Sequence, residues 1–575
     1  MENEILKKCM KSFPVEKLKD FLGRDLVDSL LEWDPGNGPA MTKARLTDMI
    51  LNIHGVSILS NKEFRAEMLR TLTPEEIFDF RCLLPPRYSD CDDMDVLIDV
   101  IASSRWKKDS KTTEKILRIL RYDSELFFPD DHVEVQSVVQ MGSFDKFYEL
   151  LDYQYVIRQK ALTILTLPYR LKRFLIHMPT GTGKTKTATH IICHYYNYCL
   201  RKKGLVIWVA HTSELLEQAY STFCNVWKNI GNGCISIYKL WGKYNFDIPE
   251  ELDGFLVCGI QKLQALALND KISFQRLVRN ARLLVYDEAH KAAATQTREI
   301  IETFMRRMPD MCDCSLMGLT ATPGRSTTES FDNNLLASMF GNRIISIDTR
   351  LMNAISMSPQ EAINARTEPD IIKYFQERGV LAKIKKEELT YPEQLTEAEI
   401  QKIKVIATDN GYDDFSKKAL EIIGKKKSRN LRILQKLREL NYQKIPTIVF
   451  ACSVSHGQLL SSMLSLENIP NALVIGDMPA RDREEAIRKF KDDDDRTNII
   501  INYEVLTTGF DATNIECVFI TRPTQSVVLY SQMLGRGLRG PQMGGKPECL
   551  LVDIKDNLAQ YNENMAFSHF DNYWS

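Results

Sequence analysis

Two motifs in this chain combine residue types that can hold a phosphorylated ligand and cleave it. In the first, residues 178–185 read Met-Pro-Thr-Gly-Thr-Gly-Lys-Thr and lie between an apolar run, 174–177, and a segment of helical pattern. A strand, a glycine-rich turn and a helix are the context of a phosphate-binding loop, whose backbone amides converge on the phosphates at the positive end of the helix. We expect the nucleotide to contact Thr180, Gly181, Thr182, Gly183, Lys184 and Thr185.

The second motif is a pair of carboxylates at the end of another apolar run. Asp287 and Glu288 directly follow residues 283–286, Leu-Leu-Val-Tyr. Lys184 would reach the outer phosphates, and the Thr185 hydroxyl together with Asp287 would bind Mg²⁺. Glu288 would polarise the attacking water. The two motifs together predict a site for ATP and Mg²⁺.

One residue departs from the strict phosphate-loop pattern. The pattern Gly-x4-Gly-Lys-Thr has glycine at position 178, where this chain has Met. The alternative interpretation is a glycine-rich turn that binds nothing, and the presence of the second motif argues against it.

Length and composition describe a multidomain globular protein. A chain of 575 residues is too long for one ordinary core and predicts roughly three or four domains. The formal net charge of −1 gives no overall positive field, although amides, hydroxyls and local patches can still contact nucleic acid. No apolar run approaches the ~20 residues that span a bilayer, and the first residues are acidic without the apolar core of a secretory signal. The 13 cysteines form no Cys-x-x-Cys pair, which favours a reducing, cytoplasmic location without structural zinc.

Apolar periodicity divides the chain into four parts. Residues 1–140 show apolar spacings of three and four, which predict an all-helical accessory domain. In 141–350 and again in 431–575, strand-like runs alternate with helical stretches, so each part is expected to be an α/β domain with a parallel sheet. The polar range 351–430 is expected to be a helical linker or insertion. The expected strands are 205–210, 255–259, 283–286 and 316–319 in the first α/β domain and 447–450, 472–475, 498–501, 517–520 and 549–552 in the second.

Two arginines of the second α/β domain could act on a phosphate that the first one holds. The segment 532–539, Gln-Met-Leu-Gly-Arg-Gly-Leu-Arg, places Arg536 and Arg539 three residues apart, and we expect them on one face of a helix. Guanidinium groups on a separate domain can serve as arginine fingers when the domains close. The site is therefore predicted to be split between the two domains.

In the order and wording of its motifs, the chain resembles the DEAH-type helicases and translocases of superfamily 2. Within them it is most similar to the branch that contains the motor subunits of type I and type III restriction enzymes and XPB-like repair helicases. The wording of 178–185, Met at 178 included, and of 530–539 is typical of that branch, and the similarity covers roughly residues 150–560. The resemblance implies two RecA-like parallel-sheet domains after the helical one.

The resemblance also implies roles for residues that the local pattern does not single out. Gln159, ahead of the phosphate loop, matches the glutamine that reads adenine, and an ordinary surface glutamine is the alternative. The other matches are His290 and Gln532, which link the γ-phosphate to the nucleic-acid side; Thr320 and Thr322 of the coupling motif; Thr508, Gly509 and Asp511 of the segment that meets nucleotide and nucleic-acid backbone; and Arg536 and Arg539 as the fingers.

Two loops of the first α/β domain match the family's strand-contacting loops. In 210–218 and 259–263, the residues that could contact backbone phosphates are Thr212, Ser213, Gln261 and Lys262. Ordinary helix caps are the alternative interpretation of these side chains.

The leading hypothesis is an ATP-dependent DNA helicase or translocase, and the resemblance favours 3′-to-5′ tracking. Two alternatives stay open. One is a nucleic-acid sensor whose ATPase cycle gates a partner effector docked on the helical domain, and the other is an RNA helicase. No nuclease signature is evident, so a partner protein is expected to make any cut. Prokaryotic defence against foreign DNA is the expected setting, with DNA repair as the second choice.

Overall fold

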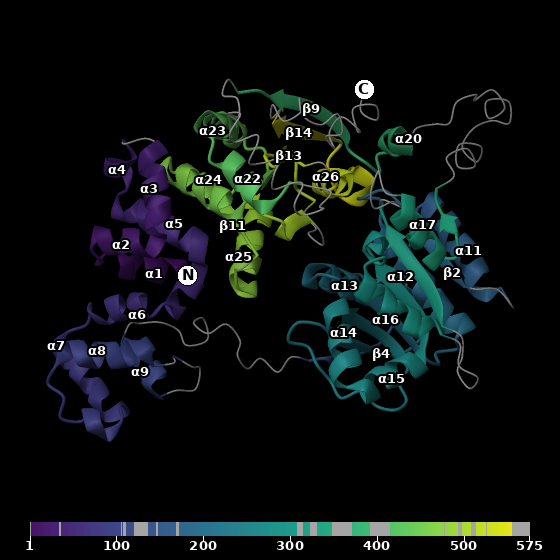
Figure 1. Ribbon diagram of the computed structural model, residues 1–575, viewed down its shortest axis with the longest axis horizontal. Helices are drawn as coiled ribbons and strands as arrows, with labels where there is room; N and C mark the ends of the chain where they lie inside the picture. Colours follow the sequence, from purple (N-terminus) through teal and green to yellow (C-terminus); the bar gives the residue numbers. More distant parts are fainter. Residues whose placement is uncertain are drawn as a thin grey trace.

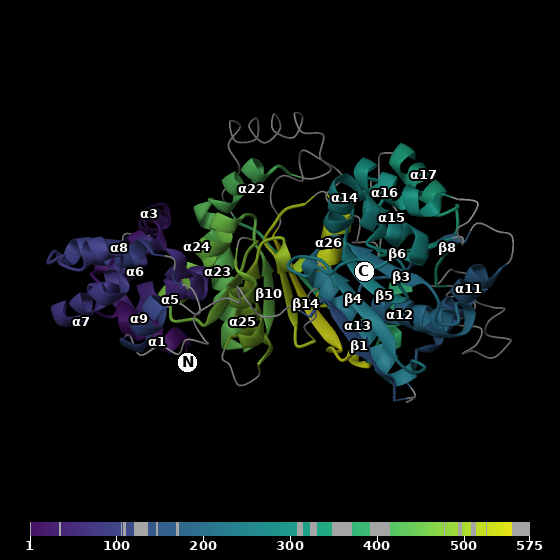
Figure 2. The same ribbon diagram turned by 90° about the horizontal axis from the view of Figure 1, so that it is seen from below.

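The structure is a computed structural model that describes residues 2–33, 36–104, 106, 111–119, 136–144, 148–167, 172–306, 314–321, 330–347, 371–391, 415–476, 478–492, 497–507, 513–524 and 526–554. These residues form a helical region and two units that are each built on a separate sheet. In space the second sheet unit lies between the helical region and the first sheet unit (Figure 1, Figure 2). In the part of the chain that the structure describes, no helix is both long enough and apolar enough to cross a membrane.

The amino-terminal region is helical, as its apolar spacing predicts. Phe13, Phe21 and Phe64 meet in its core, and the rings of Phe21 and Phe64 pack edge to face with centroids 5.1 Å apart. Side-chain caps define several helix starts: Thr73 and Glu76, for example, form a reciprocal capping box. The elements are α1 (Glu2–Met10), α2 (Val15–Leu22), α3 (Arg24–Trp33), α4 (Asn37–Ala40), α5 (Lys43–His54), η1 (Gly55–Ser60), α6 (Lys62–Leu69), α7 (Pro74–Phe78), η2 (Asp79–Leu83), η3 (Pro86–Tyr88), α8 (Met94–Ser103) and α9 (Lys111–Ile119).

The first sheet has eight strands in the order β1-β4-β5-β3-β6-β7-β2-β8, all parallel except the antiparallel pair of β1 and β4. Its strands alternate between two buried faces: Val206 and Trp208 pack with α11–α13, and Leu205 and Ile207 pack with α14–α17. The strands are β1 (Val138–Met141), β2 (Arg173–His177), β3 (Leu205–Ala210), β4 (Ile235–Leu240), β5 (Gly254–Gly259), β6 (Ala281–Asp287), β7 (Ser315–Thr320) and β8 (Ile344–Ile345). The helices are α11 (Asp152–Thr166), α12 (Lys184–His194), η4 (Tyr195–Cys199), α13 (Ser213–Ile230), α14 (Ile260–Asn269), α15 (Lys271–Asn280), η5 (Ala289–Lys291), α16 (Thr295–Met305) and α17 (Ser330–Met339).

The second sheet has six parallel strands in the order β11-β12-β10-β13-β14-β9. The mixed α/β fold with two parallel sheets behind a helical region is thus confirmed. The strands are β9 (Lys383–Leu389), β10 (Thr447–Phe450), β11 (Asn471–Val474), β12 (Ile499–Asn502), β13 (Cys517–Ile520) and β14 (Glu548–Ile554). The helices are α20 (Ile371–Glu377), α22 (Lys417–Gly424), α23 (Lys427–Tyr442), α24 (Val454–Leu466), α25 (Ala480–Lys491), η6 (Val505–Thr507), α26 (Val527–Leu534) and η7 (Pro541–Met543).

Three expectations from the sequence need correction. The range 351–430 is not wholly helical, because the charged segment Lys383–Leu389 forms the edge strand β9 beside β14. Strand β1 spans the expected boundary at residue 140 and belongs to the first sheet. Arg536 and Arg539 do not share a helix face, because α26 ends at Leu534 and glycines follow it.

Candidate active site

The phosphate loop connects β2 to α12 at the carboxyl end of the first sheet. Gly181 and Gly183 adopt φ of 86° and 82°, a left-handed conformation that side chains rarely tolerate. Met178 has no such constraint: its side chain is fully buried in the core, and its amide donates to the Thr320 carbonyl at 3.1 Å. The loop therefore tolerates Met at position 178, where the strict pattern has glycine.

Two neighbouring residues of α11 brace this loop. The Tyr153 hydroxyl and the Gln154 amide both donate to the carbonyl oxygen of Thr182, at 2.8 and 3.0 Å. A Cβ on Gly183 would lie 2.5 Å from the Gln154 nitrogen, so the glycine is also required by this close approach. Gln159, the glutamine predicted to read adenine, lies on an exposed face of α11 and is not among the residues that line the cavity described below. The two glutamines are five residues apart along the helix, which turns their side chains to different faces.

A lysine and two carboxylates meet at the mouth of this loop. The Lys184 ammonium donates to the carbonyl of Met178 at 3.1 Å, and Asp287 accepts from the amide of Glu288 at 3.0 Å. Burial lowers the pKa of Lys184, and the nearby charges of Glu288 and Asp287 oppose that shift. Burial and the charge of Glu288 raise the pKa of Asp287, against the effect of Lys184. Such a set of mutually dependent buried charges is typical of a site that binds a charged ligand.

Behind the carboxylates, a histidine connects Glu288 to β7. The Nδ1 atom of buried His290 lies 3.3 Å from the Thr320 hydroxyl and 3.3 Å from a carboxylate oxygen of Glu288. Glu288 itself adopts φ of 52°, a conformation uncommon for a residue other than glycine. Thr322, the second hydroxyl of the predicted coupling motif, lies outside the described residues.

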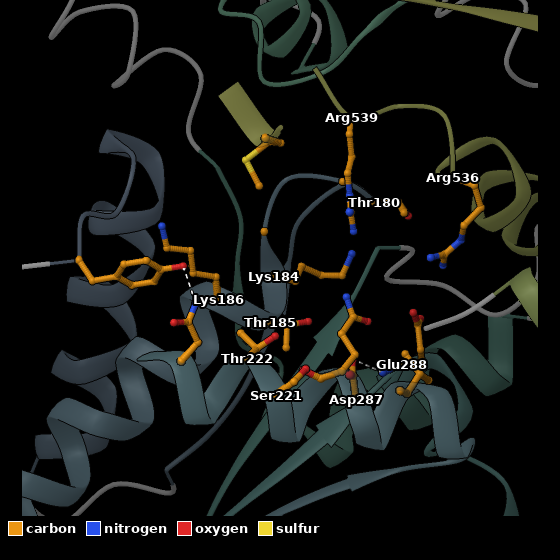
Figure 3. A pocket seen from close by; sticks show the side chains of 17 residues that line it. Thr180, Lys184, Thr185, Lys186, Ser221, Thr222, Asp287, Glu288, Arg536 and Arg539 are labelled. Carbon is orange, nitrogen blue, oxygen red and sulfur yellow. Dashed lines mark hydrogen bonds between the residues drawn. The ribbon is translucent and has the colours of Figure 1, made fainter. Parts of the chain in front are cut away.

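The two arginines of the second sheet unit reach the same place from the opposite side. The turn after α26 places Arg536 against the charge of Glu288, while burial lowers the pKa of Arg536 to about 10. Arg539 pairs with Leu381 in an isolated β-bridge, and burial lowers its pKa as well. In Figure 3, Arg536 points toward Glu288 and Arg539 toward Lys184.

These groups line one cavity of about 450 Å³ between the two sheet units. The first sheet unit contributes the phosphate loop, the carboxylates and a row of polar residues on α13 that the sequence prediction did not include. The lining residues are Tyr148, Thr180, Gly181, Gly183, Lys184, Thr185, Lys186, Leu215, Gln218, Ser221, Thr222, Asn225, Asp287, Glu288, Arg536, Arg539 and Met543. The carboxylates and the arginine side chains thus face one space from two separate units.

Two family models match the chain in the same order. Residues 147–325 match the res subunit of type III restriction enzymes, and residues 429–540 match the helicase conserved C-terminal domain. The chain belongs to the superfamily-2 helicases of the restriction-enzyme motor type.

Individual relatives agree with this family. IRC3 of Saccharomyces cerevisiae, named as an ATP-dependent helicase, is 26% identical over 393 residues, which are 67% of this chain and 48% of the yeast protein. The endonuclease subunit of the type I restriction enzyme EcoKI of Escherichia coli is 25% identical over 392 residues, 64% of this chain and 31% of that protein. This chain therefore spans less than half the length of either relative. The crystal structure of the DUF1998 helicase MrfA bound to DNA matches with a TM-score of 0.51 and 15% identity, covering 81% of this chain and 55% of that chain, which shows the shared fold.

Three of the four residues expected to contact nucleic acid through the first α/β domain form hydrogen bonds within this chain. Thr212 caps α13 by accepting from the Leu215 amide, as the helix-cap alternative predicts, and Ser213 is exposed beside it. Gln261 donates to the His211 carbonyl at 3.0 Å, and Lys262 donates to the Asn245 side chain at 3.2 Å.

The predicted residues of the second sheet unit are described only in part. Gln532 is buried in α26, and its amide nitrogen has no hydrogen-bond partner among the described residues. Thr508, Gly509 and Asp511 lie outside the described residues.

Proposed function

We propose that the protein is a DNA-stimulated ATPase motor that binds ATP between its two sheet units and couples hydrolysis to movement on DNA. The observation that carries this proposal is the split cavity, in which Lys184, Asp287 and Glu288 of one unit face Arg536 and Arg539 of the other.

The residues that line the cavity can take separate roles in phosphoryl transfer. Lys184 and the loop amides would hold the outer phosphates, while Glu288 would orient and polarise a water molecule for attack on the terminal phosphorus. Arg536 lies close enough to Glu288 for their charges to interact, and there it would stabilise the charge that develops on the terminal phosphate. Because the arginines belong to the second unit, the site is complete only when the units are together.

A magnesium ion fits the donor set at this position. The Thr185 hydroxyl and the Asp287 carboxylate are hard oxygen donors of the kind that Mg²⁺ prefers. Burial and the charge of Glu288 raise the pKa of Asp287, so a bound cation would stabilise its ionised form. The metal would supply charge neutralisation for the phosphate oxygens.

The path from the site to the nucleic acid would run through β7. His290 contacts both Glu288 and Thr320, so a change at the carboxylate reaches the end of that strand through direct contacts. The loops that carry Thr212 and Gln261 lie at the carboxyl ends of β3 and β5, which belong to the same sheet edge. We propose that these loops grip the strand and that the grip alternates with closure.

The proposed substrate and biological setting rest on the similarity to known proteins. The similarity to restriction-enzyme subunits favours DNA over RNA as the substrate. Tracking in the 3′-to-5′ direction and a role in prokaryotic defence stay predictions from the family resemblance. A cytoplasmic location, and a protein partner for the helical region, stay predictions from the sequence.

The test is ATP turnover by the full chain with single-stranded DNA, double-stranded DNA and RNA of matched sequence. We expect DNA to accelerate turnover and Lys184→Ala to abolish it. Stimulation by RNA alone would favour the RNA-helicase alternative. Turnover that survives Lys184→Ala, or that no polynucleotide accelerates, would contradict the proposal.

A further inference from the structure

One helix that the mechanism above does not use forms a wall of the nucleotide cavity. On α13, four polar residues follow the spacing i, i+3, i+4 and i+7, which places them on one helix face. They are Gln218, Ser221, Thr222 and Asn225, and all four line the cavity. The opposite face of α13 is buried in the core through Leu216, Ala219, Phe223, Val226 and Trp227.

Two of these side chains have hydrogen-bonding capacity that no protein group uses. In the described part of the chain, neither the Gln218 amide nor the Thr222 hydroxyl hydrogen-bonds to another protein group, whereas the Ser221 hydroxyl donates to the Gln218 carbonyl at 3.1 Å. Figure 3 shows Ser221 and Thr222 near Thr185 and Asp287. Polar groups that face a cavity without a partner are available to a ligand.

At the Asn225 end of this row, the side chain of Tyr148 is held by contacts with three other residues. The Asn225 amide donates to the Tyr148 hydroxyl at 3.3 Å. The Lys186 ammonium lies 4.2 Å from the centroid of that ring, and His190 stacks on the ring with centroids 5.8 Å apart. Met543 of the second sheet unit lines the same cavity. An aromatic ring and an amide together suit a nucleoside better than a phosphate.

The order of groups along the cavity assigns its two ends. Arg536 and Glu288 lie at one end and Lys186 at the other, with Lys184 and Thr185 between them (Figure 3). If the terminal phosphate lies at Glu288, as the proposed function requires, the nucleoside lies beside Lys186 and Tyr148. We propose that the α13 row is a nucleoside-binding wall, in which Thr222 and Asn225 hydrogen-bond the ribose hydroxyls and favour ribonucleotides over deoxyribonucleotides.

The test compares binding of ATP and 2′-deoxyATP to the full chain by competition with a fluorescent nucleotide. We expect the unaltered protein to bind ATP about fivefold more tightly, the ratio expected from one hydrogen bond of ordinary strength. Thr222→Val keeps the side-chain shape without the hydroxyl, and Asn225→Ala removes the amide. Each should weaken ATP binding and bring the ratio of the two affinities close to one.

A matched control lies on another helix of the first sheet unit. Asn269 is exposed at the end of α14 and does not line the cavity, so Asn269→Ala should retain the discrimination. If Thr222→Val and Asn225→Ala bind both nucleotides as the unaltered protein does, while Lys184→Ala loses binding, the wall is refuted and the proposed function stands. If the unaltered protein binds neither nucleotide, both are refuted.

Discussion

At the scale of single residues, Gln154 links the helix α11 to the phosphate loop. Its amide donates to the Thr182 carbonyl and lies against Gly183, so it helps to fix the backbone that would hold the phosphates. We expect Gln154→Ala to raise the dissociation constant for ATP about fivefold to tenfold, the effect of losing one hydrogen bond at the site. Gln159→Ala is the matched control on the exposed face of the same helix and should bind as the unaltered protein does. Equal effects of the two substitutions would contradict the assignment, and titration of a fluorescent ATP analogue measures both.

A buried histidine of the second sheet unit makes an acid-sensitive contact. The Nδ1 atom of His456 accepts from the Cys452 amide at 3.1 Å, so the proton is on Nε2, which donates to Asn430 at 3.0 Å. Burial, with a further effect of Arg429, lowers the pKa of His456 to about 3. A depressed pKa means that the unfolded chain takes up the proton first, so this stabilisation is complete above pH ~6.5 and decreases as the pH falls toward ~3, by about 1.4 kcal/mol for each pH unit.

Thermal unfolding between pH 7.5 and pH 5 tests this contribution. We expect the Tm of the unaltered protein to fall over this range. His456→Gln cannot be protonated, so its Tm should be lower at pH 7.5 and should then decrease less with acid. Parallel pH profiles for the two proteins would show that His456 is not the sensitive group.

At the scale of elements, the turn after α26 determines how closely the two units approach. A Cβ on Gly535 would lie 2.2 Å from the Thr180 Cγ2 atom, and Arg536 is the next residue. We expect Gly535→Ala to hold the turn away from the phosphate loop and to reduce kcat for ATP hydrolysis at least about tenfold, because Arg536 is displaced. The affinity for ATP should change less, since the first unit still binds the phosphates.

The second-site substitution Thr180→Gly removes the two Thr180 atoms that the new methyl group would strike and leaves the Ser531 carbonyl oxygen at 3.0 Å. The double variant should therefore recover part of the lost kcat, as measured by steady-state turnover with DNA. A Gly535→Ala protein with unaltered turnover would show that this contact does not form during hydrolysis.

The sequence predicts best those strands in which every residue is buried. Apolar runs such as Leu205–Ala210 are buried on both faces and are recognised as parallel strands without further information. Strand β9, Lys-Ile-Lys-Lys-Glu-Glu-Leu, is an edge strand in which charges are tolerated, so its composition resembles that of a polar helix. The contact of Gln154 with the phosphate loop could not be predicted, because its partner Thr182 is distant in the sequence. The end of α26 is a different case, since Gly535 and Gly537 directly after Leu534 are a local signal for the end of a helix.

At the scale of the whole molecule, the helical region precedes the first sheet in sequence but packs on the second. Val449 and Phe519 of the second sheet share a buried apolar cluster with Met49 of α5. The side chain of Asp482, in the first turn of α25, accepts from the amides of Val56 and Ser57 at 3.1 and 3.2 Å. The helical region therefore covers the β11 edge of the second sheet, and we expect the two to move together relative to the first sheet unit.

The contact at Gly55 allows this packing to be tested. A Cβ on Gly55 would lie 2.5 Å from the Asp482 carboxyl carbon, so Gly55→Val should separate the two surfaces. Amide hydrogen exchange should then accelerate in both α5 and β11 and remain unchanged in α12 and α13. Gly142→Val, at a glycine with open space around it, is the control. Acceleration confined to α5 would show that the helical region is attached more loosely than the shared core implies.

The central claim is that one ATPase site is shared between the two sheet units, and the function of Arg536 tests it most directly. The measurement is single-turnover hydrolysis of bound ATP in the presence of DNA by the unaltered protein, by Arg536→Ala and by Arg438→Ala, a control whose arginine pairs with Glu467 on the surface. We predict that Arg536→Ala still binds ATP but hydrolyses it about a thousandfold more slowly or worse, as expected for loss of an arginine finger, while Arg438→Ala is unaffected. Hydrolysis by Arg536→Ala at the rate of the unaltered protein would contradict the account.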